Sequence, residues 1–488
     1  MTEPEGKELL AERREKLDRL RDAGIDPFPH GFPGREEIGT VVEAHAELDS
    51  GEETDRVHTV AGRVVGKRGH GKVVFLDLRD QTGTIQVLAA SDHLPEESFE
   101  ALDLIDLGDF VGVTGRALST RRGELSLEAS EWNMLAKSLR PPPDKFHGLE
   151  DVETRHRRRE LDLIANEETR RIFRIRTQTI AEIRRQLDGR GFFEVETPVL
   201  QPLYGGALAR PFTTHHNALD REFYLRIATE LYLKRCVVGG IEKVYELGKD
   251  FRNEGVSPKH NPEFTMLEWY EAYADYEKTA ADLETLVAAV AEAVLGTTTV
   301  ERDGKAVDLS PPWERVTLRD AILDATGIDI EKERTLEALA DRMGVEPEAG
   351  TGWGKLVDTL FSRQVEPNLI RPTFVMDYPV ELSPFAKHHR SKEGVVERWE
   401  AFVAGMEIAN AFTELNDPDE QRRRFEQQAA ELAGGDEEAQ PYDEAFVEAL
   451  EQGMPPTGGV GLGIDRLAMI LSGAPSVREV VLFPAMRD

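Results

Sequence analysis

Two expected strands joined by a proline-bearing loop, between Phe251 and Tyr270, constrain the fold of this sequence more than any other segment. The first strand ends in Phe251-Arg252-Asn253-Glu254-Gly255, and the loop carries Lys259-His260-Asn261-Pro262. Alternate side chains of a strand point to one face, and that face of the second strand carries Phe264, Met266, Glu268 and Tyr270. An aromatic surface and acidic side chains therefore lie side by side, which suits a flat base beside a cationic substrate.

Length and charge limit the classes of protein that fit. A chain of 488 residues is too long for one ordinary core, so we expect two or three domains. The formal net charge of −32 argues against attraction of nucleic acid to the whole surface, so any RNA contact must be local. The single cysteine, Cys236, excludes an internal disulfide and fits a cytoplasmic protein; we expect it to lie in the core.

No segment reads as a membrane anchor. The first 24 residues are charged and carry leucines at helical spacing, which predicts an amphipathic helix and not a signal peptide. The most apolar later run, residues 286–295, is shorter than the roughly 20 residues that a membrane span needs. We expect a soluble protein with no membrane partner.

The pattern along the chain changes several times. Residues 57–135 alternate in short runs between glycine-bearing turns, which predicts a small antiparallel barrel. The run Arg140-Pro141-Pro142-Pro143 predicts a stiff linker. A helix over residues 167–189 is expected before a strand that ends in Glu196-Thr197-Pro198.

Helical patterns follow Tyr270, over residues 276–295, 317–325 and 335–343, and we interpret them as an insertion because strand patterns resume only near Thr373. The glycines between Gly458 and Gly463 do not match the G-x-G-x-x-G spacing of a dinucleotide loop. Close packing of their backbone against a nucleotide or a neighbouring strand explains them better.

Three of these segments resemble motifs one, two and three of the class II aminoacyl-tRNA synthetases: the helix-strand unit ending at Pro198, residues 251–254 and residues 461–466. Three others are similar to the lysine-specific branch of that family: Gly205-Gly206-Ala207 with residues 209–212, then residues 215–220, and residues 230–235. The resemblance covers nearly the whole chain.

The resemblance implies an α+β fold with an N-terminal oligonucleotide-binding barrel (OB-fold) and a class II catalytic domain, an antiparallel sheet flanked by helices. The expected segments are an N-terminal helical segment at 1–54, the anticodon-binding barrel at 55–137, a linker at 138–165 and the catalytic domain at 166–488, with a helical insertion at about 276–370.

The resemblance also implies the ATP site. Arg252 would contact the α-phosphate and the amino-acid carboxylate, which suits its fixed fork of donors. Phe264 and Arg466 would sandwich the adenine. Glu254 would bond near the adenine, and His260 would approach the terminal phosphates. The full set implied for ATP is Arg252, Glu254, His260, Asn261, Phe264, Glu400, Glu407 and Arg466.

Glu400 and Glu407 resemble the family's Mg²⁺ ligands, and two acids beside a triphosphate suffice for that ion. If Ala404-Gly405 forms a hairpin turn, Phe402 pairs with Glu407, and Glu400 is a diagonal neighbour at roughly 7–8 Å between backbones. With simple alternation along the strand, the Glu407 side chain would point to the face opposite to that of Asn410 and the pocket residues beyond it. We therefore infer a bulge between Glu407 and Asn410. We expect no zinc, because His215 and His216 lack a cysteine or a spaced carboxylate partner.

The amino-acid pocket follows from the same resemblance. Glu230 and the backbone around Gly206 would hold the α-ammonium, and Asn410 would assist Arg252 at the carboxylate. The side-chain ammonium would meet Glu268, Tyr270 and Glu414. Acids at this end select a cation, whereas a relative that activates aspartate would need a positive group there. Taken singly, Glu268 or Glu414 reads as a solvated strand acid; within the ordered motifs a ligand role is favoured.

Two questions about RNA stay open. Phe75 and Gln86 match positions that the family uses on the anticodon, with Arg63 nearby, and stacking plus base-edge bonds would read single-stranded RNA; the alternative is that Phe75 is a core residue. The basic run 155–159 is either a solvated face or a contact to tRNA phosphates. Beside it, Glu160 stands where relatives tend to carry tyrosine.

The implied enzyme is a homodimer, formed through the unit ending at Pro198, that activates L-lysine with ATP and transfers it to the 3′ end of tRNA(Lys). Two alternatives were weighed. A paralogue that lysylates a protein would lack the barrel. A catalytically inactive RNA-binding relative would have lost Arg252, Glu400, Glu407 or Arg466, and all four are present.

Overall fold

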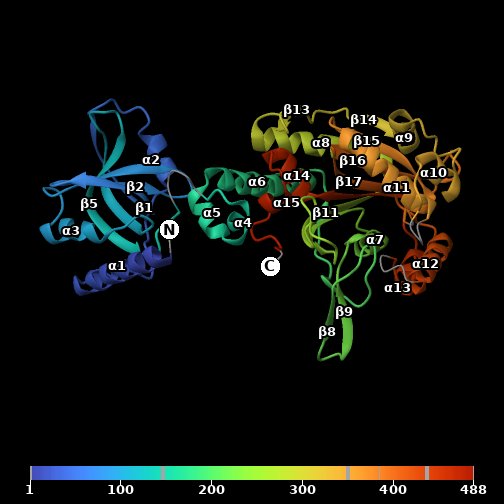
Figure 1. Cartoon of the computed structure of the whole chain (residues 1–488), viewed down its shortest axis with the longest axis horizontal. Helices are drawn as coiled ribbons and strands as arrows, with labels where there is room; N and C mark the ends of the chain where they lie inside the picture. The colour runs from blue at the N-terminus through green and yellow to red at the C-terminus, as the bar shows by residue number, and fades with distance from the viewer. Residues whose placement is uncertain (1–2, 144–148, 348–351, 384, 435–438, 487–488) are drawn as a thin grey trace. The chain divides into compact units, whose positions relative to one another are not determined.

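A computed structural model describes residues 3–143, 149–347, 352–383, 385–434 and 439–486 (Figure 1). The chain divides into two compact units, Met1–Glu150 and Asp151–Asp488. The linker expected at 138–165 lies partly outside the described residues.

The first unit is built on a closed barrel with the strand order β1-β2-β3-β5-β4. Its strands are β1 (Glu53–His70), β2 (Val73–Arg79), β3 (Thr84–Ala90), β4 (Phe110–Ser119) and β5 (Leu125–Ala136). Its helices are α1 (Glu3–Asp22), α2 (Ile38–Ala44), α3 (Glu96–Ala101) and the 3-10 turn η1 (Leu102–Leu104). The predicted barrel is confirmed, and it closes the sheet so that its edges are paired.

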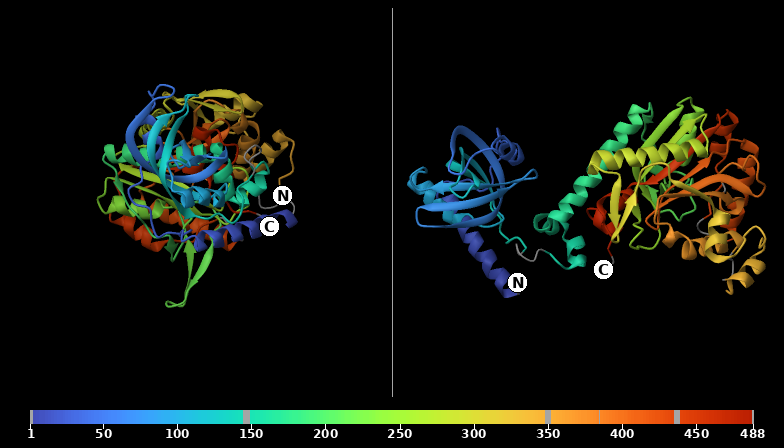
Figure 2. Two further views of the ribbon diagram at one scale, coloured as in Figure 1. Left: turned by 90° about the vertical axis from the view of Figure 1, so that its left-hand side faces the viewer. Right: turned by 90° about the horizontal axis from the view of Figure 1, so that it is seen from above.

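Helix α1 packs on the barrel as its amphipathic pattern predicts (Figure 2). Leu17 and Leu20 are buried, and Leu20 belongs to the same apolar cluster as Val60, Leu76 and Val87 of the barrel. No helix among the described residues is long and apolar enough to cross a membrane.

The second unit is centred on an eight-stranded sheet, within the described residues, of order β14-β15-β16-β17-β18-β11-β10-β6. Its strands are β6 (Phe193–Glu194), β10 (Lys243–Phe251), β11 (Glu263–Ala272), β14 (Glu314–Thr317), β15 (Thr373–Pro379), β16 (Val395–Val403), β17 (Met406–Thr413) and β18 (Thr457–Gly463). The edge strands β14 and β6 run parallel to their neighbours, and the central strands are antiparallel.

Helices cover one face of this sheet. The helices of the unit are α4 (Val152–Arg157), α5 (Arg159–Ala165), α6 (Glu167–Gly189), α7 (Glu230–Val238), α8 (Tyr276–Leu295), α9 (Leu318–Thr326), α10 (Leu336–Met343), α11 (Trp353–Gln364), α12 (Pro418–Ala433), α13 (Glu444–Glu451), α14 (Ile464–Ser472) and α15 (Val477–Val480), with 3-10 turns η2 (Glu366–Asn368) and η3 (Val380–Leu382). Residues of α6, α8 and α14 share the main core with Leu267 and Trp269 of β11. Met266, Glu268 and Tyr270 therefore point to the opposite face.

Smaller sheets lie outside the central one. The strands are β7 (Leu200–Gln201), β8 (Thr213–His216) and β9 (Arg221–Leu225) in one sheet, and β12 (Thr299–Arg302) and β13 (Lys305–Asp308) in another. The hairpin of β8 and β9 extends away from the body of the second unit (Figure 1).

Two expectations were wrong. The strand expected to end at Pro198 comprises only Phe193–Glu194, because the Thr197 N–H and hydroxyl donate to the Glu246 carboxylate and not to a strand partner. The segment after Tyr270 is not purely helical: the β12–β13 hairpin interrupts it, and β14 joins the central sheet well before Thr373. A four-residue strand is too short to show a period of two, which is why the pattern missed it.

The predicted hairpin and bulge near Glu407 are both present. Ala404 and Gly405 form the turn with positive φ values of 52° and 71°. Phe402 pairs with Glu407, whereas Ala401 pairs with Ala409, so Ile408 is the extra residue. The bulge brings Glu407 onto the same face as Asn410 and the residues beyond it.

The basic run 155–159 is mainly structural. Arg155 and Arg159 contact the fully buried Asp162 at 2.9 and 2.6 Å, and the buried His156 lies 3.1 Å from Glu479 of α15. The other two arginines are more exposed, and Arg158 pairs with Glu160 at 2.6 Å. Glu160 thus makes a surface ion pair.

We predict that Asp162→Asn destabilises the second unit by about 3–5 kcal/mol, because it removes the carboxylate that contacts the fully buried Arg159 at 2.6 Å and leaves Glu479, 3.9 Å away, as the remaining counter-charge. Glu153→Gln, which breaks the exposed Glu153–Arg157 pair, is the control and should cost about 0.3–0.5 kcal/mol. Urea unfolding of both variants measures the difference. Equal effects would show that the run is a solvated surface.

Candidate active site

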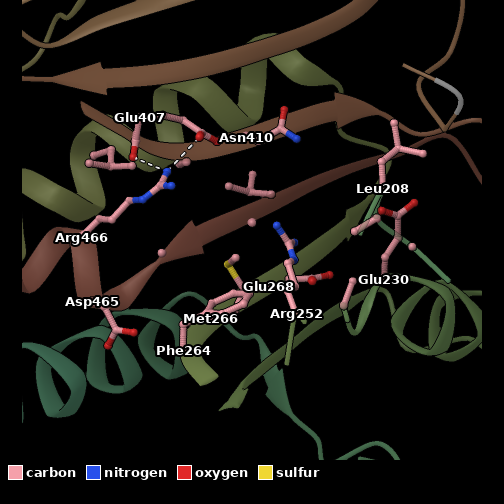
Figure 3. Close-up of a pocket in the computed structure, with 18 of the residues that line it drawn as sticks. Leu208, Glu230, Arg252, Phe264, Met266, Glu268, Glu407, Asn410, Asp465 and Arg466 are labelled. Atoms are coloured by element: carbon pink, nitrogen blue, oxygen red, sulfur yellow. Dashed lines mark hydrogen bonds and ion pairs between the residues drawn. The ribbon is translucent and has the colours of Figure 1, made fainter. Parts of the chain in front are cut away.

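A cavity of about 360 Å³ lies on the face of the sheet opposite α6, α8 and α14. It extends from Glu407 and Arg466 at one end to Leu208 and Glu230 at the other (Figure 3). The predicted site residues that line it are Gly206, Glu230, Arg252, Glu254, His260, Asn261, Phe264, Glu268, Tyr270, Glu407, Asn410, Glu414 and Arg466. Within the part of the chain that the structure describes, Glu400 is the one predicted site residue that does not line the cavity.

Arg466, in the first turn of α14, closes one end of the cavity. Its Nη1 donates to the Glu407 carboxylate and to the Glu407 backbone oxygen, both at 2.8 Å (Figure 3). Its Nη2 lies 3.2 Å from His260 Nε2. Burial would raise the pKa of Glu407, but the Arg466 guanidinium outweighs burial and the pKa is lowered. The Glu407 carboxylate is therefore ionised at neutral pH.

His260 and Asn261 belong to the loop between β10 and β11. Burial, helped by the Arg466 charge, lowers the pKa of His260, so its ring is neutral at pH 7. Since Nε2 faces a guanidinium, the Nδ1 proton is directed at Ser257 Oγ, 2.9 Å away. Asn261 bonds to the Glu263 oxygen and the Ala485 N–H, so its amide ties the loop to the C-terminal segment.

Arg252 and Phe264 lie at the middle of the cavity. The Arg252 guanidinium is 5.1 Å from the centre of the Phe264 ring, and Asp250 pairs with Phe264 across β10 and β11. Arg252 Nε donates to the Ile227 backbone oxygen at 3.4 Å. A planar cation held beside an aromatic face leaves its other donors available for an anion.

Glu268 is buried beneath the cavity floor. Its two oxygens accept hydrogen bonds from the Thr229 N–H at 3.1 Å and the Tyr270 hydroxyl at 3.0 Å. Burial, reinforced by the charges of Asp250 and Glu230, raises the pKa of Glu268 to about 8. A buried carboxyl with so high a pKa gains stability when a cation is bound beside it.

Glu230 stands at the N-terminus of α7, beside Gly206. A Cβ on Gly206 would lie 3.0 Å from the Glu230 Cβ, and Gly206 has a φ of 90° that favours glycine. The Gly206 N–H donates to Gln440 Oε1 at 3.0 Å. Glycine therefore lets the backbone approach the Glu230 carboxylate.

Glu414 follows β17 directly and is 1% exposed. Its Oε2 lies 2.5 Å from the Nζ of Lys234, a fully buried lysine of α7 that also contacts Glu230 at 2.6 Å. Its Oε1 has no hydrogen-bond donor within the described part of the chain. A Cβ on Gly459 would lie 2.0 Å from that oxygen and 2.4 Å from the Tyr270 ring, so the predicted close packing of this glycine is confirmed.

Glu400 lies behind the cavity wall. Its Oε2 accepts from the Tyr378 hydroxyl at 2.8 Å, and its Oε1 is paired with Arg398, which also donates to Asn410 Oδ1 at 3.1 Å. Burial, together with the charge of Glu407, raises the pKa of Glu400 to about 7. The two predicted magnesium ligands thus influence each other electrostatically.

Sequence reasoning missed Lys234, Arg398 and Gln440. Lys234 could have been found, since a Glu-Lys pair four residues apart on a helix places the two side chains together. Arg398 shares a strand face with Glu400, which period two also shows. Gln440 reaches Gly206 from 234 residues away, and no local pattern predicts that contact.

On the barrel, Phe75 is half-buried and lies outside the barrel's apolar cluster, with the Arg68 guanidinium 5.7 Å from its ring. Gln86 is buried and accepts from the Ser126 hydroxyl at 2.8 Å. Arg63 is turned towards β4, where it bonds to the Gly108 oxygen and covers the Phe110 ring. The core interpretation of Phe75 is therefore wrong.

Known proteins match both units. The family of class II tRNA synthetases (D, K and N) matches residues 151–487, and the OB-fold nucleic acid binding domain matches residues 58–135. A lysine–tRNA ligase of Moorella thermoacetica is 51% identical over 98% of each chain. The lysine–tRNA ligase of Synechococcus sp. (strain CC9311) is 51% identical over 98% of this chain and 99% of its own length. That of Bacillus subtilis is 49% identical over 98% of this chain and 97% of its own length. The chain belongs to the class II tRNA synthetases (D, K and N).

Proposed function

We propose that the protein is a lysine–tRNA ligase, which activates L-lysine with ATP and transfers it to tRNA(Lys). The observation that supports this proposal most directly is the charge at one end of the cavity. Three buried acids, Glu230, Glu268 and Glu414, line the same cavity as Arg252. Lysine offers two ammonium groups to these acids and one carboxylate to the arginine. The names of the relatives agree with this choice of substrate.

The geometry supports an in-line reaction without a protein nucleophile. Arg252 would hold the lysine carboxylate and the α-phosphate together, so that a carboxylate oxygen forms a bond to the α-phosphorus while the bond to pyrophosphate breaks. The adenine would occupy the space between Phe264 and Arg466. The 3′-terminal hydroxyl of the tRNA then attacks the carbonyl carbon of the adenylate, and AMP leaves.

The residues at the Glu407 end fit a magnesium ion. Glu400 and Glu407 are carboxylates on neighbouring strands, brought onto one face by the bulge at Ile408. Each is paired with an arginine, Arg398 or Arg466, that a triphosphate would attract. Mg²⁺, when bound, would neutralise phosphate charge and complete its ligands with phosphate oxygens and water.

The remaining parts of the proposal concern RNA, assembly and location. The half-buried ring of Phe75, with Gln86 and Arg63 on the same barrel, would contact the anticodon. The unit ending at Pro198 exposes Phe193, and the next two residues, Val199 and Leu200, are exposed as well, which supports a homodimer through this edge. A cytoplasmic enzyme is consistent with the single unpaired cysteine, Cys236.

Pyrophosphate exchange with each amino acid in turn, with and without tRNA, tests the proposed function. Lysine alone should support rapid exchange, and charging should require tRNA(Lys). Exchange with aspartate or asparagine, or none with lysine, would overturn the assignment.

We predict that Glu268→Gln raises the KM for lysine by two or more orders of magnitude, since removing one partner of a buried charge pair costs about 3–5 kcal/mol and each 1.4 kcal/mol is about tenfold. The KM for ATP should stay near normal, because Phe264, Glu254 and Arg466 are untouched. Exchange kinetics with each substrate varied separately measure both constants. Equal damage to both would contradict the pocket assignment.

The pH dependence of lysine binding gives a further prediction. Glu268 and Glu414 have raised pKa values of about 8 in the free pocket, so both are largely protonated below that pH. A substrate ammonium requires the ionised form, so the KM for lysine should fall as the pH rises from about 6 to about 8. A KM that rises over this range would contradict the prediction.

We predict that Glu400→Gln and Glu407→Gln each raise the Mg²⁺ concentration needed for half-maximal exchange, and that the double change is less than additive because the two share ions. Titration of MgCl₂ at fixed ATP measures this requirement. Fully additive effects, with an unchanged Mg²⁺ requirement, would rule out shared coordination.

A further inference from the structure

Lys234 lies outside the cavity lining but connects two of its acids. Its side chain is completely buried, and its Nζ contacts Glu230 Oε1 at 2.6 Å and Glu414 Oε2 at 2.5 Å. Glu230 comes from the N-terminus of α7, and Glu414 follows β17, so one ammonium group joins residues far apart in the sequence.

The charges of this group are not balanced without a ligand. When all three acids, Glu230, Glu268 and Glu414, are ionised, Lys234 offsets one of their charges through its contacts to Glu230 and Glu414, and two negative charges remain in a region shielded from water. A substrate with two ammonium groups restores neutrality, since its own carboxylate is matched by Arg252. A pocket with the same acids and no Lys234 would keep one uncompensated negative charge after such a substrate binds.

We propose that Lys234 is a positioning residue that sets the charge of this pocket to match a substrate with two ammonium groups, by favouring the ionised form of Glu230 and Glu414 and fixing the orientation of their carboxylates. This inference rests on the proposed function and deepens it. Lys234 does not touch the substrate; it acts through the two acids.

The orientation of Glu414 shows how Lys234 would act. Neither carboxylate oxygen has a hydrogen-bond partner among the described residues, but Oε2 forms an ion pair with Lys234 at 2.5 Å, whereas Oε1 lies over Gly459, where the missing Cβ leaves room for it. Oε1 is thus presented for an incoming ammonium group. A carboxylate without Lys234 would have no contact to hold it in this orientation.

The two acids are also near neighbours, because both contact the same nitrogen atom. Two carboxylates this close share a proton unless a cation separates them. Burial raises the pKa of Glu414, and Lys234 opposes that rise. In turn, Glu230 and Glu414 outweigh the burial of Lys234 and raise its pKa, so the lysine is charged.

Other charged and titratable groups around the trio come from β10 and β11. They are Glu268 and Tyr270 on β11 and Asp250 on β10, whose charge acts on Glu268. Asp250 is in turn faced by Arg226 and by Arg252, which directly follows β10. Two uncharged neighbours also lie against Lys234 and Glu414: the Phe385 ring, 5.7 Å from the Lys234 Nζ, and Gly459 of β18, beside the Glu414 carboxylate. Lys234 is therefore the cation in direct contact with both acids.

The test compares the pH dependence of the KM for lysine in the parent enzyme and in Lys234→Met, by pyrophosphate exchange between pH 6 and 9. This KM falls as the pH rises, and in the variant the midpoint of that fall should lie about 1–3 pH units higher than in the parent. A shift of this size is the usual effect of losing an opposite charge at contact distance. At pH 8 the variant's KM for lysine should be at least about fivefold above the parent's, and the ratio should narrow towards pH 9. The KM for ATP should not change.

Lys137→Met is the matched control. Lys137 is also a fully buried lysine with two carboxylate partners, Asp106 at 2.6 Å and Asp109 at 2.7 Å, but it belongs to the barrel unit. Its loss should lower the stability of the barrel and leave the pH dependence of lysine exchange unchanged. A shift shared by both variants would show a general effect of removing a buried lysine.

A second variant keeps the test decisive if Lys234→Met does not fold. The double variant Lys234→Met/Glu414→Gln removes the cation together with one acid, so no pair is left to share a proton, and its pH midpoint should return towards that of the parent. A midpoint in the double variant that lies about 1–3 pH units above the parent's, or a parent-like pH profile in a folded Lys234→Met, would overturn the role of Lys234. Absence of lysine exchange in the parent would instead refute the proposed function.

Discussion

The need to compensate buried negative charge organises the second unit. Glu230, Glu268 and Glu414 are buried together on one face of the sheet. Unpaired charges in such a place cost several kcal/mol each, so the surrounding structure must either supply cations or leave room for them. Lys234 supplies one, and the cavity leaves space for the rest. The same reasoning applies at the other end, where Arg398 and Arg466 face Glu400 and Glu407.

The backbone makes this concentration of acids possible. The bulge at Ile408 puts Glu407 in phase with Asn410, so a single strand serves both ends of the cavity. Gly459 leaves space for the Glu414 carboxylate and the Tyr270 ring, and Gly206 allows the chain to approach Glu230. An alanine at either glycine would displace an acid that the site depends on.

Much of this arrangement could be predicted from the sequence, because it depends on strand periodicity and on ordered motifs. The shared face of Phe264, Glu268 and Tyr270 follows from period two, and the bulge follows from requiring Glu407 and Asn410 to share a site. The parts that could not be predicted depend on contacts between distant segments. The arginines of run 155–159 look like a solvated face until Asp162 and Glu479 are placed beside them. Similarly, β14 is too short to show a strand pattern and is stabilised by pairing with β15.

The central claim is that lysine binds because its ammonium groups allow buried carboxyl groups to ionise. Calorimetric titration of lysine into the enzyme at pH 7, in two buffers of different ionisation enthalpy, measures the protons exchanged on binding. The raised pKa values of Glu268 and Glu414 in the free pocket predict net proton release to the buffer. Equal heats in the two buffers, or net proton uptake, would contradict it.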